Sequence, residues 1–305
     1  MLALLVPGGG EGGSGSGRAN AAAQACSGCE TGTVMGAGVS PTVLRLTKHH
    51  GLGNDFLVLL EAPPDLDTGA LACRACDRHR GIGADGLLVA RAGRDGADVG
   101  MELRNADGSR AEMSGNGVRC FAQAVWDARP ELGPTLVVAT DVGLREVRRV
   151  GADGPGHLLA SVDMGLVKVC SDGAQWVGGS INAAVLVDAG NPHLVLLDAG
   201  VASVEVGVAG PRIEATFPGG LNVEWVWPGP GADELTLRVW ERGAGETQAC
   251  GTGSCAAAAA AVSWGCVGPD VVVHNPGGDL RVTLGGTAVL TGPAVRVASV
   301  ELAWP

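Results

Sequence analysis

The amino-acid sequence predicts an α+β protein made of two similar lobes that face each other across a cleft. Short apolar or alternating segments, separated by turns, recur along nearly the whole chain and predict strands. Two longer stretches, 115–127 and 251–264, have the apolar patterns of buried helices. A set of landmarks also occurs twice in the same order, which indicates that one structural unit is duplicated.

The duplicated landmarks differ at one matched position. Asn105 and Glu241 each end an alternating strand, and nine positions later come Ser114 and Cys250, each followed by Gly-x-Gly at the start of a predicted helix. Upstream, a Gly-Asn pair precedes the two strand ends by 51 and 50 positions. The two nucleophile positions are therefore expected to meet in one cleft. A cysteine there can become a thiolate, whereas the anion of a serine is scarce near neutral pH.

The remaining segments follow from periodicity and composition. Residues 1–41 are rich in Gly, Ala and Ser without a hydrophobic period, so they predict a disordered leader, and Met35 is an alternative start. We divide the rest into an N-terminal lobe over 42–155, a C-terminal lobe over 156–292 and a last strand over 293–305. A further helix is predicted at 67–79. Strands are predicted at 42–48, 56–60, 86–90, 98–104, 135–140, 144–149, 158–164, 193–197, 221–227, 234–240, 270–274, 280–284 and 294–302.

Composition limits the possible functions. The net charge of −11 argues against nucleic acid as a partner, because backbone phosphates would be repelled. No apolar run approaches the length of about 18 residues that predicts a membrane span, and the short apolar start lacks a basic region, so we expect a cytoplasmic protein. Only Lys48 and Lys168 could form a Schiff base with pyridoxal phosphate, and neither lies in a supporting motif. No cofactor is therefore expected.

The nine cysteines predict free thiols rather than a disulfide framework, since their number is odd and no export signal is present. Cys26-x-x-Cys29 and Cys73-x-x-Cys76 have the spacing of zinc half-sites. The first pair lies in the predicted leader and the second on a predicted helix, so no metal site is expected.

Two Gly-x-Gly turns can create a site for a two-base reaction. The first amides of a helix are free donors at the positive end of its dipole, and they bind anions. A carboxylate held between both helix starts would have Ser114 and Cys250 on opposite faces of its α-carbon. One group could then remove the α-proton while the other delivers one, which inverts the centre. The same amides would stabilise the developing carbanion and lower the pKa of a neighbouring thiol.

The ordered motifs resemble those of the diaminopimelate epimerase family, from about residue 44 to 302. The matching stretches are Gly53–Phe56, Asp77–Gly86, Asn105–Ser109, Gly115–Gly117, Gly190–His193, Asn222–Glu224, Glu241–Thr247 and Ala249–Gly253. The resemblance implies two lobes, each with a curved, mainly antiparallel sheet wrapped around a central helix, and a last strand that returns to the first lobe. It also implies inversion of LL-diaminopimelate to meso-diaminopimelate without a cofactor, in a homodimer.

The resemblance assigns roles to individual residues. Cys250 is similar to one catalytic cysteine, and Ser114 stands where the family has the other. Positions that hold the polar groups of the substrate, chiefly its distal amino-acid end, are Asn54, Asn105, Asn191, Asn222 and Arg242. Acidic and imidazole groups that line the same site are Glu241 and His193. Turn positions whose amides bind the reacting carboxylate are Gly115, Asn116, Gly251 and Thr252.

Several of these residues also have purely structural interpretations. Asn191 could be a turn residue, Arg242 could form a surface ion pair, and His193 could be a core histidine. Arg78 to Arg80 are expected to be charges at a helix end, and Cys120, about 240° around the helix from Ser114, is expected to pack in the core.

Ser114 leaves three functions open. The protein could be a diaminopimelate epimerase that uses a Ser/Cys pair, a related epimerase of another amino acid, or a binding protein that has lost turnover. Ser114 could also replace a native cysteine. The complete set of Asn, Glu and Arg residues favours the first alternative, and the retained motif around Cys250 disfavours the third.

Overall fold

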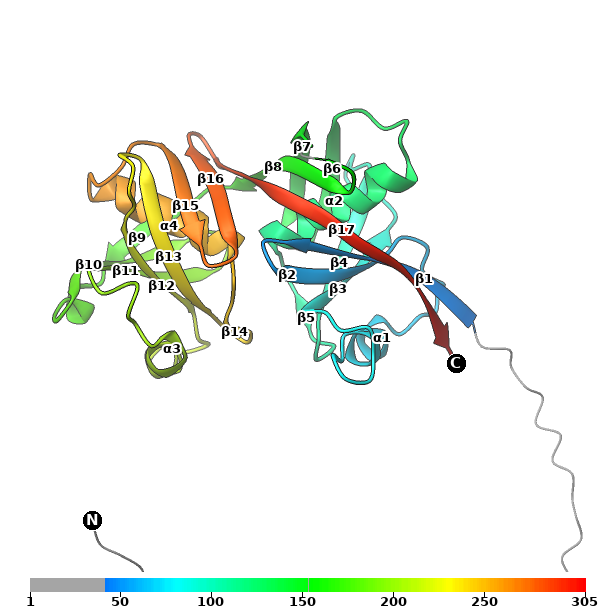
Figure 1. Ribbon diagram of the computed structural model, residues 1–305, viewed down its shortest axis with the longest axis horizontal. Helices are drawn as coiled ribbons and strands as arrows, with labels where there is room; N and C mark the ends of the chain where they lie inside the picture. Colours follow the sequence, from blue (N-terminus) through cyan, green and yellow to red (C-terminus); the bar gives the residue numbers. More distant parts are fainter. Residues whose placement is uncertain (1–41, 153) are drawn as a thin grey trace, which may run out of the picture. The chain divides into compact units, whose positions relative to one another are not determined.

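Strands dominate the part of the chain that the structure describes, residues 42–152 and 154–305, which also contains four α-helices (Figure 1). The structure is a computed structural model. The predicted leader, with Met35 and the Cys26-x-x-Cys29 pair, lies outside these residues. The α+β prediction is thus corrected to a mainly-β class, because strands such as Ile181–Asp188 form without a clear signal in the sequence.

The first half of the chain forms a ring of strands beside one long helix. Its elements are β1 (Thr42–Gly51), β2 (Asn54–Leu59), α1 (Thr68–Ala75), β3 (Gly86–Arg91), β4 (Val99–Asn105), β5 (Arg110–Ala111), α2 (Gly115–Ala128), β6 (Thr135–Thr140), β7 (Gly143–Gly151) and β8 (His157–Gly165). The pairs β2–β3 and β4–β6 are parallel, and the other neighbours are antiparallel. Both β8 and β1 pair with β17 (Ala288–Trp304), which closes the ring.

The second half repeats this order of pairings. Its elements are β9 (Lys168–Asp172), η1 (Ala174–Trp176), β10 (Ile181–Asp188), β11 (Pro192–Asp198), α3 (Val206–Glu214), β12 (Asn222–Pro228), β13 (Glu234–Glu241), β14 (Gly245–Glu246), α4 (Gly251–Ser263), β15 (Asp270–Asn275) and β16 (Gly278–Leu284). Here β11–β12 and β13–β15 are the parallel pairs. The boundaries of two lobes remain a prediction, since Pro41–Pro305 form one compact unit.

The two long helices are the most buried elements. The run of alanines in α4 gives this helix no polar face, and nearly all of its residues are buried, as the sequence predicts. In α2, every residue from Gly115 to Trp126 is buried. Each helix is positioned by the strands of its own half, so the first turn of each is fixed from several sides.

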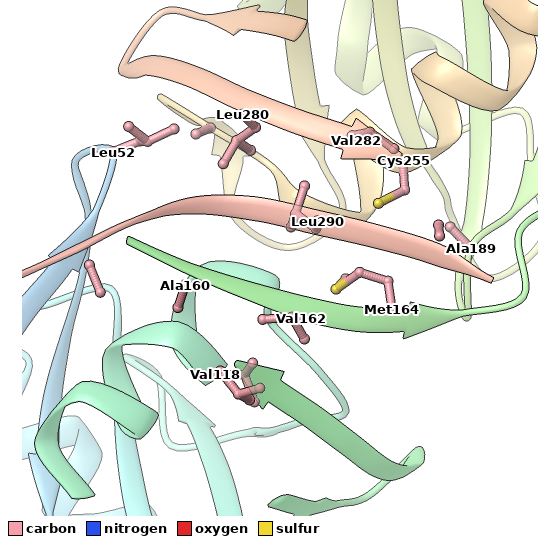
Figure 2. Packing of buried hydrophobic residues seen from close by; sticks show 14 of the residues in the cluster. Leu52, Val118, Ala160, Val162, Met164, Ala189, Cys255, Leu280, Val282 and Leu290 are labelled. Atoms are coloured by element: carbon pink, nitrogen blue, oxygen red, sulfur yellow. The ribbon is translucent and has the colours of Figure 1, made fainter. Parts of the chain in front are cut away.

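Strand β17 joins the two halves. It pairs with β16 over residues 288–291, with β8 over 288–295 and with β1 over 295–304. Figure 2 shows Leu290 of β17 between Leu280 of β16 and Val162 of β8, and these side chains belong to one buried hydrophobic cluster. The hydrophobic core is therefore continuous across both halves.

Several predicted elements differ from the structure. The helix predicted at 67–79 ends at Ala75, and the next residue, Cys76, is its C-cap. Strands β9 and β10 and helix α3 were not predicted from the sequence. Helix α3 contains Gly210 and Pro211, residues that normally oppose a helix, and Gly210 lies so close to Trp240 that a Cβ atom there would be 2.3 Å from its ring. Packing against Trp240, which no local pattern reveals, explains this glycine.

Candidate active site

Ser114 and Cys250 occupy the same position on two helices. Ser114 is the N-cap of α2 and accepts a hydrogen bond from the Gly117 amide at 3.0 Å. Cys250 is the N-cap of α4, and its Sγ accepts from the Gly253 amide at 3.3 Å. Both caps have extended backbones, so the repeated sequence produces a repeated local structure.

The two helix starts lie against each other. A Cβ atom on Gly251 would be 3.1 Å from Cα of Gly115, and both glycines contact Leu290 of β17. A larger residue at either position would push the helix starts apart. The Gly-x-Gly pattern therefore permits close approach of two positive helix ends, which suits an anion that spans both.

A cavity of about 920 Å³ opens in front of these helix starts. The predicted site residues that line it are Asn54, Asn105, Ser114, Asn191, Asn222, Glu241, Arg242 and Thr252. The predicted residues that lie just behind the lining, all buried, are Gly115, Asn116, His193, Cys250 and Gly251. Arg242 forms no ion pair among the described residues; its amide donates to Asn222 Oδ1 at 2.9 Å, and its Nη1 donates to the Gly219 carbonyl.

The pKa of Cys250 is raised well above its ordinary value. Burial of the thiol is the main cause, followed by the nearby carboxylates of Glu241 and Glu224, and these outweigh hydrogen bonds from Thr252 and the Gly253 amide. The Gly253 amide lowers this pKa, as expected, but its effect is smaller than the effects of burial and of the two carboxylates. Cys250 therefore rests as a neutral thiol.

A buried acid–imidazole pair lies behind Cys250. His193 Nδ1 is 2.6 Å from Glu224 Oε1, and its Nε2 is 2.8 Å from Asn191 Oδ1. Glu224 Oε2 is buried without a hydrogen-bond partner among the described residues. Burial raises the pKa of both Glu224 and Glu241. No role for Glu224 was predicted from the sequence, although a carboxylate inside the apolar strand Asn222–Pro228 is a possible signal.

The corresponding positions in the first half are uncharged. The strand registers match Phe56 to His193 and Leu88 to Glu224, and the duplicated motif matches Asn105 to Glu241. A Cβ atom on Gly117 would meet the Phe56 ring at 3.4 Å, whereas one on Gly253 would meet Glu224 Oε1 at 2.7 Å. The groups that can exchange protons are thus concentrated around Cys250.

An ionic cluster holds Asn54 at the opposite wall. Asn54 Nδ2 donates to Asp85 Oδ2 at 2.8 Å. Arg78 bridges Asp85 and Asp55, each at 2.7 Å, and Lys48 pairs with Asp55 at 2.9 Å. The prediction of Arg78 as a helix-end charge is wrong, because α1 ends at Ala75 and Arg78 instead supports the cleft wall.

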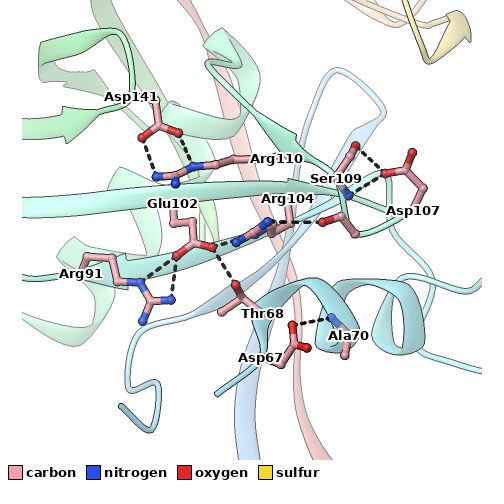
Figure 3. A network of polar contacts seen from close by, with 11 residues as sticks. Asp67, Thr68, Ala70, Arg91, Glu102, Arg104, Asp107, Ser109, Arg110 and Asp141 are labelled. Carbon is pink, nitrogen blue, oxygen red and sulfur yellow. Dashed lines mark hydrogen bonds and ion pairs between the residues drawn. The ribbon is translucent and has the colours of Figure 1, made fainter. Parts of the chain in front are cut away.

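A second polar network supports the segment between Asn105 and Ser114. Figure 3 shows the carboxylate of Glu102 bound by Arg91, Arg104 and Thr68. In the same view, Arg110 of the segment binds Asp141 through two hydrogen bonds. These contacts lower the pKa of Glu102 to about 2, so the network stays charged at neutral pH.

Of the cysteines in the described part of the chain, Cys76 is the one that lines the cavity. All seven cysteines within residues 42–152 and 154–305 are free thiols. Cys120 is fully buried in the core, as expected. In the same residues, no group of three or more metal-ligating side chains gathers, and no helix is long and apolar enough to cross a membrane.

Solved structures with this fold include epimerases and racemases. A hydroxyproline epimerase from Agrobacterium vitis superposes with a TM-score of 0.66 at 19% identity, over 86% of this chain and 92% of that chain. An epimerase-like protein from Pseudomonas aeruginosa gives 0.65 at 16% identity, over 85% and 99%. These likenesses show that the chain has the same fold as these proteins.

Sequence comparison defines the family more narrowly. The family model described as "Diaminopimelate epimerase" matches residues 46–170 and 185–297. The chain is 40% identical over 288 residues to diaminopimelate epimerase of Mycolicibacterium paratuberculosis, covering 85% of this chain and 97% of that relative. It is 41% identical over 278 residues to the Mycobacterium ulcerans enzyme, covering 84% and 95%. The chain belongs to the diaminopimelate epimerase family, which confirms the resemblance.

Proposed function

We propose that the protein inverts the α-carbon of LL-diaminopimelate to give meso-diaminopimelate, by proton transfer between Cys250 and Ser114. The observation that carries this proposal is the matched capping position of the two residues on helix starts that touch. Such a pair faces opposite sides of one bound α-carbon. The activity of the relatives and their identity of about 40% support diaminopimelate as the substrate.

The reacting carboxylate binds at the free amides of the two helix starts, those of Gly115 and Asn116 on one side and of Gly251 and Thr252 on the other. The positive ends of both dipoles favour the anion, and they favour it more as charge grows on the carboxylate when the α-proton leaves. Asn54, Asn105, Asn191, Asn222 and Arg242 hold the distal amino-acid end, because amide and guanidinium groups can bind its ammonium and carboxylate.

Cys250 acts as the base after it transfers its own proton. Glu241 lies close to the thiol, and its raised pKa makes it a stronger proton acceptor than an ordinary carboxylate. His193 lies in the same cluster and supports that transfer. The carboxylate and ammonium of a bound substrate change the charge around Cys250. Once Cys250 has given up its proton, its thiolate removes the α-proton that faces it.

Ser114 donates a proton on the opposite face. Its hydroxyl lines the cavity and is held by the Gly117 amide. After donation the serine must regain a proton, and within the described part of the chain no acid–imidazole pair lies behind it as one does behind Cys250. We therefore infer that turnover is limited on the Ser114 side. A homodimer and a cytoplasmic location are further parts of this proposal, taken from the resemblance and the sequence.

Two alternatives remain. A related epimerase of another amino acid would keep the two helix starts but bind a different distal group. A binding homologue would keep the cleft without turnover, and the absence of a second thiol at position 114 is the specific observation that favours it.

Incubation with LL- and meso-diaminopimelate in heavy water separates these functions. Inversion with α-deuterium incorporation supports the proposal. Exchange without inversion would leave Cys250 as the working base and remove Ser114 from the reaction. Saturable binding without exchange would favour the binding homologue, and neither binding nor exchange would direct the search to other amino acids.

A further inference from the structure

Arg119 is a fully buried cation one turn into α2. Its Nη1 donates to the Gly115 carbonyl at 2.9 Å, its Nη2 to Asn116 Oδ1 at 2.6 Å, and its Nε to the Pro293 carbonyl at 3.3 Å. One guanidinium group thus ties the first turn of α2 to β17. No role for Arg119 was predicted from the sequence, because a single arginine in an apolar helix has no distinctive pattern.

This cation has no anionic partner among the described residues. Every acceptor that it contacts is a neutral oxygen. Burial lowers the pKa of Arg119 to about 10, so the group still carries its charge at neutral pH. A buried charge without an anionic partner destabilises a fold, and such departures from ordinary core composition are expected at functional sites.

Asn116 links Arg119 to the other helix start. Because a guanidinium only donates, Asn116 must turn its oxygen toward Arg119 and its amino group away. That amino group donates to the Ala249 carbonyl at 3.0 Å and to Asn54 Oδ1 at 3.3 Å. Ala249 directly precedes Cys250, so Arg119 sets the position of both turns through one hydrogen-bonded chain.

The second half has no equivalent of this cation. Two residues after the last glycine of each Gly-x-Gly turn, α2 carries Arg119 and α4 carries Cys255. The carboxylates of Glu224 and Glu241 lie on the Cys250 side. The site is therefore polarised, with positive charge behind the Ser114 turn and acidic groups behind the Cys250 turn.

We propose that Arg119 is a positioning residue that holds the Ser114–Gly115 and Ala249–Cys250 turns together and supplies the charge that draws the reacting carboxylate to them. This role rests on the proposed two-base site, but it concerns carboxylate binding of any substrate. It also explains the missing partner, since the counter-charge of Arg119 is the substrate carboxylate.

Alkylation of Cys250 tests the role without requiring diaminopimelate. In iodoacetate, the carbon attacked by sulfur carries a carboxylate, as the α-carbon of an amino acid does. The thiol gives its proton to a neighbouring carboxylate or to water, and the S–C bond forms as iodide leaves. Iodoacetamide is its neutral counterpart. The rates for Cys250 are measured by peptide mapping and divided by those of glutathione. We expect Cys250 to prefer iodoacetate, and Arg119→Met to lower that preference about tenfold, as the loss of a nearby buried charge implies.

Two further variants separate charge from structure. Arg119→Lys keeps the charge without the three-way hydrogen bonding, so it should retain the iodoacetate preference within about twofold while kcat falls about tenfold. Gln123→Met is the matched control, because Gln123 is also buried on α2 and also bonds a backbone carbonyl, that of Gly156, but does not touch either turn. It should keep both the preference and kcat.

Several results would overturn the proposed role of Arg119. An unchanged preference in folded Arg119→Met, or no preference in the wild type, overturns the proposal. If Arg119→Met does not fold, a wild-type kcat in Arg119→Lys overturns it instead. If the iodoacetate preference depends on Arg119 but diaminopimelate is not epimerised, the role of Arg119 stands and the proposed function is rejected. If Arg119→Met epimerises diaminopimelate normally, the proposed function stands and the role of Arg119 is rejected.

Discussion

Replacement of Ser114 by cysteine is the most informative change to this protein. The cap geometry of Cys250 shows that a sulfur atom fits such a position, at 3.3 Å from the helix amide against 3.0 Å for the Ser114 oxygen. Ser114 also lines the cavity, so the larger atom has space. We therefore expect Ser114→Cys to fold normally.

The expected increase in kcat follows from the lower proton affinity of a thiolate compared with an alkoxide. Each pKa unit corresponds to about 1.4 kcal/mol of free energy. A helix N-terminus stabilises an anion by about 0.3–1 kcal/mol, and by up to ~2 kcal/mol in buried sites. This stabilisation is too small to offset the high basicity of a serine alkoxide. A thiol at this position would not face the carboxylates that raise the pKa of Cys250, since Phe56 and Leu88 stand in place of His193 and Glu224. A well-placed acid–base group contributes about 10²–10⁴-fold, so kcat should rise by at least about 100-fold.

The assay is epimerisation of diaminopimelate with a reductant present, followed by chiral separation of isomers. Ser263→Cys, near the far end of α4, is the control for adding a thiol, and its kcat should equal that of the wild type. An unchanged kcat in folded Ser114→Cys would refute the assignment of position 114 as a proton-transfer position.

Three other predictions concern the remaining groups. In heavy water, the isomer whose α-hydrogen faces Cys250 should gain deuterium faster than it inverts. The thiol exchanges with solvent and returns a deuteron before the weakly acidic Ser114 hydroxyl donates its proton. Equal rates would contradict this, and Cys250→Ala should abolish both processes. Gly210→Ala should lower the free energy of unfolding by about 1–3 kcal/mol in urea titrations, since the new methyl group would overlap Trp240. The folded-state pKa of Glu102 is depressed from 4.5 to about 2, so its stabilisation is present above pH 4.5 and is lost as the pH falls toward 2. Glu102→Gln should therefore flatten the acid dependence of Tm in that window, and an unchanged slope would argue against the network in Figure 3.

The sequence predicted the parts of the site that local patterns encode. The two caps, the glycines that follow them and the apolar helix α4 all depend on residues within one turn of each other. The repeated spacing also predicted that the two caps come close together, and eight of the predicted site residues line the cavity. Family resemblance added their proposed roles.

Contacts between distant segments could not be predicted. Glu224 and Arg119 lie in apolar stretches, where a single charged residue gives no sign of the partner it will meet. The raised pKa of Cys250 depends on carboxylates from β12 and β13, which only the folded sheet brings near. Helix α3 contradicts its own propensities because Trp240, 30 residues after Gly210, determines the packing.

The course of β17 has a consequence for the order in which the protein can assemble during synthesis. Thr42 pairs with Trp304, and β8 also needs β17, so the ring around α2 stays open until the last described residues have left the ribosome. Leu290 and Ala294, which complete the core against α2, arrive equally late. A nascent chain would therefore expose the part of α2 that packs against β17 until that strand has emerged. Both helix starts would then acquire their final positions in one slow, late step of high contact order.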